Sequence, residues 1–136
     1  MPSVLPDKGL DSGASRTTML ALAYILCERR PRDPAGEWEA EARFLLPTPT
    51  AFAEGLEAAG LADRGHPTDL GVQVSTDILF EDGDITGQTI VHPPEIPALL
   101  PHVDDATQLR LQAWHAFAVA LEASGQDARL VIWFIR

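Results

Sequence analysis

The sequence predicts an α+β fold, in the form of a mostly helical single domain with a small β-sheet. Prolines and glycines divide its 136 residues into short segments, several of which carry apolar residues at helical spacing. Two further segments, residues 85–91 and 128–135, are rich in β-branched and aromatic residues, which is typical of strands. The 46% hydrophobic content is enough to fill a core without disulfides or a metal.

The chain is expected to form one globular domain over residues 15–136. The segment before it, residues 1–14, has two prolines and two glycines and is expected to be flexible. The single cysteine, Cys27, cannot form an internal disulfide, and we find neither a signal peptide nor an apolar run long enough to span a bilayer. These features predict a cytoplasmic protein.

The first half of the domain is expected to hold three helices. The first runs from a cap within residues 15–18 to about Arg30, and because it is apolar on nearly every side it should be central. A short second helix is expected over residues 37–46, with acidic residues at its start. The third is expected over residues 48–60, where Gly60 suits the C-cap.

The second half is expected to alternate between helix and strand. Residues 68–79 give no decisive period and fit either a helix or a strand, of which we favour the helix. The later elements are expected to be a turn at 81–84, a strand at 85–91, an extended proline-rich stretch at 92–97, a helix at 104–124 and a strand at 128–135.

The last strand has six large apolar residues in a row, from Leu130 to Ile135. Since neighbouring side chains of a strand point to opposite faces, both faces of this segment need cover. We therefore predict that the strand is central to the fold. One domain of this size need not supply both covers, so we also expect the strand to contribute to a homodimer.

The sequence has no recognisable catalytic or metal-binding motif. The four histidines lie ten or more residues apart, and Cys27 sits in an apolar run where a thiol is a small core residue rather than a nucleophile. Asp82 and Asp84 flank Gly83 with a fragment of calcium-loop spacing, but Asp-Gly is an ordinary turn former. We predict no enzyme activity, no cofactor and no metal.

The charge is unevenly distributed along the chain. The net charge is −10, and no Lys or Arg occurs between Arg64 and Arg110. The simpler interpretation is that this charge keeps the protein dispersed, whereas the functional interpretation is that it attracts a basic partner. The candidate partner-binding residues are Asp77, Glu81, Asp82, Asp84, Glu95, Asp104 and Asp105.

One local pattern suggests a family. A helix ending in Leu56, Gly60 and Leu61 is followed by Arg64 and by a turn over residues 67–71. Together with the two helices expected before it, this pattern resembles bacterial winged-helix regulators of the MarR and PadR type over roughly residues 15–80. The resemblance implies that the helix at 48–60 would read the major groove of DNA.

The outer side of that helix departs from the family pattern. A helix that reads DNA carries Arg, Lys, Asn or Gln on its outer side. The corresponding residues here are Thr48, Thr50, Glu54 and Glu57. Two carboxylates and no cation should repel the phosphate backbone.

The function favoured by the charge pattern is that of a small acidic protein-binding module. It would act as an adaptor or inhibitor of a protein with a basic surface, with carboxylates placed where nucleic-acid phosphates would lie. No direct binding of nucleic acid or membrane is expected. A winged-helix transcription regulator is the alternative, and an enzyme with an unrecognised site is the third. The regulator would need an uncovered basic patch, for which the candidates are Arg16, Arg29, Arg30, Arg32 and Arg43.

Overall fold

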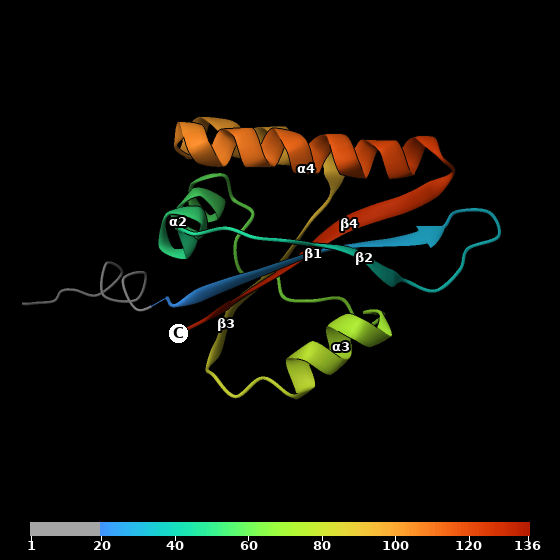
Figure 1. Ribbon diagram of the computed structural model, residues 1–136, viewed down its shortest axis with the longest axis horizontal. Helices are drawn as coiled ribbons and strands as arrows, with labels where there is room; N and C mark the ends of the chain where they lie inside the picture. Colours follow the sequence, from blue (N-terminus) through green and yellow to red (C-terminus); the bar gives the residue numbers. More distant parts are fainter. Residues whose placement is uncertain (1–19) are drawn as a thin grey trace, which may run out of the picture.

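The computed structural model describes residues 20–136, which form a four-stranded sheet between two helical layers (Figure 1). The expected flexible segment, residues 1–14, and the expected cap at 15–18 lie outside this range. Within it the elements are β1 (Leu22–Pro31), β2 (Glu39–Phe44), α2 (Pro49–Ala58), α3 (Val72–Leu79), β3 (Ile85–Val91), the 3₁₀ helix η2 (Pro93–His102), α4 (Asp105–Ala123) and β4 (Gln126–Ile135). The described residues thus form a four-stranded sheet as well as helices, and the prediction of a mostly helical domain is wrong.

The sheet is antiparallel throughout, with the strand order β2-β1-β4-β3. β1 and β4 pair over their whole lengths, from Leu22 opposite Ile135 to Pro31 opposite Gln126. β4 lies between β1 and β3, so the prediction that the C-terminal strand is central is confirmed.

The first expected helix, which was to end near Arg30, is strand β1. Ile25 and Leu26 point to opposite faces of the sheet and are 0% and 2% exposed. A strand buried on both faces has a continuous apolar run, and such a run cannot be distinguished by periodicity from a helix that is apolar all round. Pairing with β4 along ten positions decides in favour of the strand.

The second expected helix, at 37–46, is the edge strand β2. Its burial alternates between exposed and partly buried residues along all six positions. Ala42 and Phe44 pack on the α4 side of the sheet, whereas Ala40 packs on the α3 side, because the register with β1 shifts between Cys27 and Glu28. Alanine and glutamate are good helix formers, but tertiary context commonly overrides helix propensity, and sheet pairing does so here.

The remaining helices and β3 agree with the sequence prediction, apart from the proline-rich stretch. α2 ends before Gly60, which has a φ of +75°, and the Asp104 side chain caps α4 by accepting the backbone N–H of Thr107. Residues 93–102 form η2, although we expected residues 92–97 to be extended. Pro93 and Pro94 fit its first turn because the N–H groups there have no helical partner.

Two apolar cores result, one on each face of the sheet. α2, η2 and α4 cover one face, where Phe52, Leu111 and Trp114 pack against β1 and β4. α3 covers the other face, where Val74 packs with Val131, Trp133 and Ile135. Both faces of β4 are therefore covered from within the chain, and the homodimer stays a prediction for light scattering to test.

Candidate functional site: the α3 surface and its buried anchor

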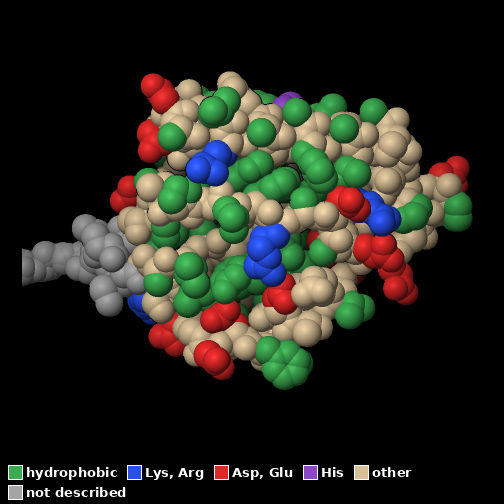
Figure 2. All heavy atoms as spheres, viewed as in Figure 1, with side chains coloured by type: hydrophobic (Ala, Val, Ile, Leu, Met, Phe, Trp, Pro, Cys, Tyr) green, Lys and Arg blue, Asp and Glu red, His purple; other side chains and the backbone are tan. Residues whose placement is uncertain are grey.

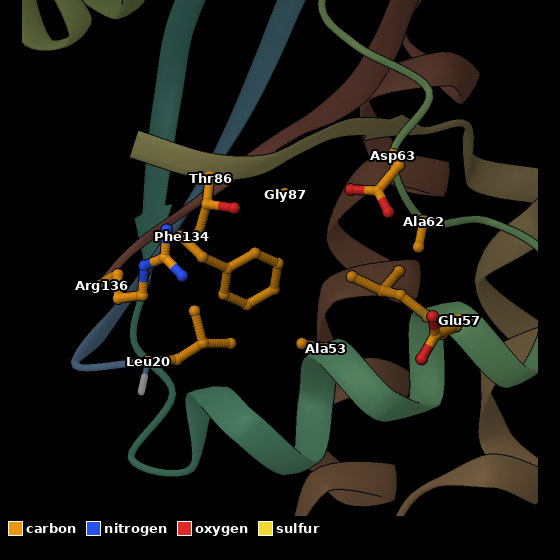
Figure 3. A pocket seen from close by; sticks show the side chains of 10 residues that line it. Leu20, Ala53, Glu57, Ala62, Asp63, Thr86, Gly87, Phe134 and Arg136 are labelled. Atoms are coloured by element: carbon orange, nitrogen blue, oxygen red, sulfur yellow. The ribbon is translucent and has the colours of Figure 1, made fainter. Parts of the chain in front are cut away.

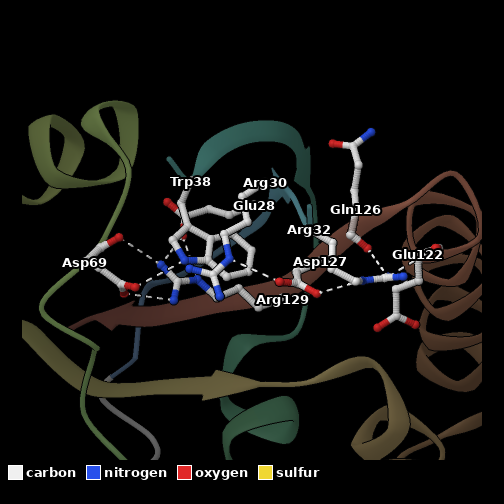
Figure 4. A network of polar contacts seen from close by, with 9 residues as sticks. All are labelled: Glu28, Arg30, Arg32, Trp38, Asp69, Glu122, Gln126, Asp127 and Arg129. Carbon is white, nitrogen blue, oxygen red and sulfur yellow. Dashed lines mark hydrogen bonds and ion pairs between the residues drawn. The ribbon is translucent and has the colours of Figure 1, made fainter. Parts of the chain in front are cut away.

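A buried ion pair lies at the centre of the sheet, on the face that α3 covers. Glu28 of β1 and Arg129 of β4 stand opposite each other in the strand register. Arg129 Nε donates to Glu28 Oε1 at 2.9 Å, and the two side chains are 5% and 0% exposed. The Trp38 ring stacks on the guanidinium, with the Arg129 carbon 3.9 Å from the ring centroid (Figure 4).

Both members of the pair also hold the segment that leads into α3. Arg129 Nη1 donates to Asp69 Oδ1 at 3.0 Å, and Nη2 donates to the Asp69 carbonyl at 3.2 Å. Glu28 Oε2 accepts the backbone N–H of Gly71, at 2.7 Å. A Cβ at position 71 would lie 2.8 Å from Glu28 Oε2, so glycine is needed for this close approach. α3 is thereby attached to the sheet at its N-terminal end.

We call the side chains of Glu28, Arg129, Asp69 and Trp38 the anchor, and their polar groups have partners within the fold. Burial alone would raise the pKa of Asp69, but the hydrogen bonds and charge of Arg129 outweigh burial and hold that pKa below its ordinary value. Trp38 Nε1 donates to Asp69 Oδ2 at 3.2 Å, and the Arg30 guanidinium also lies over the Trp38 ring, 4.6 Å from its centroid. Groups engaged in this way position a structural element, which here is the start of α3.

α3 itself is apolar on two sides. Val74 and Ile78 face the sheet and pack with the smaller core. Val72 and Leu79 lie seven residues apart, on the opposite side of the helix, and are 78% and 75% exposed. Phe80, directly after the helix, is also 75% exposed. Large apolar side chains are thus presented to solvent by an element that already has its own core contacts.

Acidic residues follow this apolar group without a break. Asp82 and Asp84 are exposed in the loop between α3 and β3, and Glu81 accepts the backbone N–H of Gly83 at 2.9 Å. Figure 2 shows acidic side chains next to projecting hydrophobic ones on the α3 side of the molecule. We call this group the α3 surface; its members are Val72, Leu79, Phe80, Glu81, Asp82 and Asp84.

The other four candidate acidic residues lie apart from the α3 surface or are engaged within the fold. Asp77 accepts a hydrogen bond from Arg43 Nη2 at 3.0 Å. Asp104 and Asp105 begin α4, in the layer on the opposite side of the sheet, where hydrogen bonds from Thr107 lower the pKa of Asp104. The seven residues do not form one continuous face.

Glu95 is the most firmly engaged of the four. Arg64 Nη1 and Nη2 donate to its two carboxylate oxygens at 2.8 and 2.7 Å, and the His92 backbone N–H donates to the same carboxylate at 2.9 Å. The hydrogen bond from Arg64 is the main cause that lowers the pKa of Glu95 from 4.5 to about 2. Glu95 therefore serves the link between η2 and the loop at 61–66.

This link predicts a specific acid sensitivity. A carboxylate with a depressed pKa stabilises the fold fully above its unfolded value of 4.5, and that contribution is lost as the pH falls toward about 2. As the pH falls over this range, the Glu95→Gln variant is expected to lose about 1 kcal/mol less unfolding free energy than the wild type. The difference is small because solvent partly screens the ion pair of Glu95 with Arg64. Urea titrations at a series of pH values measure the difference, and equal pH slopes for the two proteins would contradict the assignment.

The anchor and the apolar part of the α3 surface were not found by sequence reasoning. Glu28 and Arg129 are separated by 101 residues, so only their sheet register brings them together. One local signal was available, because Leu79 and Phe80 stand directly before the acidic run. An apolar pair at the end of an already amphipathic helix indicates a second contact surface.

Comparisons of the chain with protein-family models, with curated protein sequences and with solved structures found no match. Within residues 20–136, no three His, Cys, Asp or Glu side chains are grouped so that they could hold a metal ion. In the same residues, every helix is too short or too polar to cross a bilayer.

Proposed function

We propose that this protein is a binding module for another protein and uses the α3 surface as its contact. It would act as an adaptor or inhibitor of a partner that has an apolar cleft and a basic border. The observation that carries this proposal is the placement of Leu79 and Phe80, both 75% exposed, directly before Glu81, Asp82 and Asp84. Apolar side chains supply binding energy at an interface, and the charges around them steer and select the partner.

The charge around the α3 surface favours a basic partner. No Lys or Arg occurs from residue 65 to residue 109, so no cation from this long segment offsets the acidic loop. Arg43 is close to α3, but its guanidinium is engaged by Asp77. A partner whose own ligand is nucleic acid would meet carboxylates where phosphates would otherwise lie, which is how inhibition by charge mimicry would work.

Two observations support the protein-binding proposal over the regulator. The segments expected to be the first two helices of a winged helix are strands β1 and β2, which leaves α2, the turn after it and α3 as the part that fits the resemblance. The described arginines of the expected basic patch are also paired with carboxylates: Arg29 with Glu39 and Glu41, Arg30 and Arg32 with Asp127, and Arg43 with Asp77. Arg16 lies outside the described residues.

Site-specific photocrosslinking in the native host tests the proposal. A benzophenone amino acid in place of Phe80 is expected to crosslink one partner protein. The same group in place of Val119, which is 43% exposed on α4, is expected to give no such product. The partner should carry a basic surface, and its capture should be lost when Leu79 is also changed to Ser. Equal crosslinking from both positions, or capture of nucleic acid, would contradict the proposal.

A further inference from the structure

A pocket of about 290 Å³ lies on the α2 side of the sheet, near the ends of β3 and β4. Its apolar lining is formed by Phe134, Leu56 and Leu20, which come from β4, α2 and the start of the described chain. Both Phe134 and Leu56 are almost fully buried members of the larger core. The pocket therefore exposes part of that core at its floor.

Opposite charges stand on opposite sides of this floor. Figure 3 shows the Arg136 guanidinium beside Thr86 on one side of the Phe134 ring, and the Asp63 and Glu57 carboxylates on the other. Within residues 20–136, neither Arg136 nor Asp63 takes part in an ion pair. The charged groups of Arg136 and Asp63 thus face the pocket from opposite sides, and neither is paired within the described residues.

The backbone at Gly87 and the loop that carries Asp63 set the shape of the pocket. Gly87 has a φ of +62° at an irregularity between Thr86 and Thr89, where a Cβ would come within 2.8 Å of Phe134 Cδ2. The loop that carries Asp63 is tied to this strand by a hydrogen bond from Gly65 N to the Gln88 carbonyl, 2.9 Å long. Bulges and left-handed residues are frequent beside binding sites, because they aim side chains in directions that regular structure does not allow.

We infer that this pocket binds a small zwitterion with a branched aliphatic body, of the size of a free amino acid. The carboxylate of the ligand lies toward Arg136, its ammonium group lies toward Asp63, and its aliphatic part covers Phe134. The volume is near the lower end of small-molecule pockets, roughly 300 Å³, which suits an amino acid better than a nucleotide. No residue of the α3 surface lines this site, although the Arg136 backbone N–H donates to the Asp84 carbonyl at 2.9 Å, and the inference does not depend on the proposed protein partner.

Leucine and two analogues test the inference by their charges. NMR titration of the full chain with leucine is expected to give saturable shifts at the amides of Thr86 and Gly87, with a Kd on the order of millimolar. 4-Methylpentanoate lacks the amine and 3-methylbutylamine lacks the carboxylate, so each is expected to bind at least about threefold more weakly than leucine.

Two variants separate the contributions of the two ends. Asp63→Asn should weaken leucine and 3-methylbutylamine by about threefold but leave 4-methylpentanoate unchanged, whereas Arg136→Gln should have the reverse selectivity. Asparagine also tolerates the left-handed conformation at position 63, where φ is +57°. Arg110→Gln, on α4, is the matched control and should not change any of the three affinities.

A third variant tests the cavity itself. Ala53→Met places a longer side chain on the pocket wall and should abolish the leucine-dependent shifts, while the rest of the spectrum stays folded. The inference is overturned if leucine gives no saturable shifts, if it binds no better than both analogues, or if Asp63→Asn and Arg136→Gln act on all three ligands alike.

Discussion

Arg129→Met is expected to lower the free energy of unfolding by about 3–5 kcal/mol, because it leaves the Glu28 carboxylate buried without its charge partner. Glu28 is 0% exposed, and the guanidinium that faces it supplies bonds of 2.9 and 2.8 Å. The substitution also removes the contacts to Asp69 that hold the start of α3. Urea denaturation followed by tryptophan fluorescence measures the loss.

Two further variants show whether the loss comes from the unpaired charge. Adding Glu28→Gln to Arg129→Met removes that charge and should recover at least about 1 kcal/mol. Arg32→Met breaks a solvent-exposed pair with Asp127 and should cost less than about 1 kcal/mol. A loss below about 1 kcal/mol for Arg129→Met would show that Glu28 and Arg129 do not hold the fold together.

Deleting residues 130–136 is expected to have the largest effect, which is the loss of cooperative folding. β4 pairs with β1 on one side and β3 on the other, and its residues from Ala128 to Ile135 are all buried. Without most of β4, no strand would join the β1–β2 pair to β3, and both cores would lose their central residues.

Calorimetry and circular dichroism of the truncated chain test this expectation. We expect an insoluble product or a chain without a cooperative transition. Arg136→Ala, which changes only the exposed last residue, should melt as the intact protein does. A soluble truncated chain that melts cooperatively would show that the C-terminal strand is dispensable.

The elements predicted correctly are those whose signals are local. β3 has β-branched residues between turn formers, and α4 has a capping aspartate at one end and Gly125 at the other, so their types follow from the sequence. The boundary signals of β1, a cap within residues 15–18 and Pro31 at its end, also fit a helix, and its all-round apolarity fits a buried helix and a central strand equally well. Only the pairing with β4, about a hundred residues later, distinguishes the two.

The same distinction between local and long-range signals explains why only part of the candidate site was predictable from the sequence. The acidic run at Glu81, Asp82 and Asp84 is contiguous and was identified from charge alone. Asp104 and Asp105 belong to the same cation-free segment, but the fold places them on the opposite side of the sheet. The anchor that holds α3 depends on strand register, and local patterns contain no information about register.

The dependence of the partner's association rate constant on salt tests the α3 surface most directly. Between about 50 mM and about 500 mM salt the wild-type rate constant should fall by about tenfold, because screening shortens the range of the acidic field. Asp82→Lys should lower the rate constant at low salt and flatten this dependence, whereas Asp105→Lys, the same charge change on the far side of the sheet, should alter neither. Equal effects of the two reversals, or no salt dependence in the wild type, would contradict the assignment of the α3 surface as the binding site.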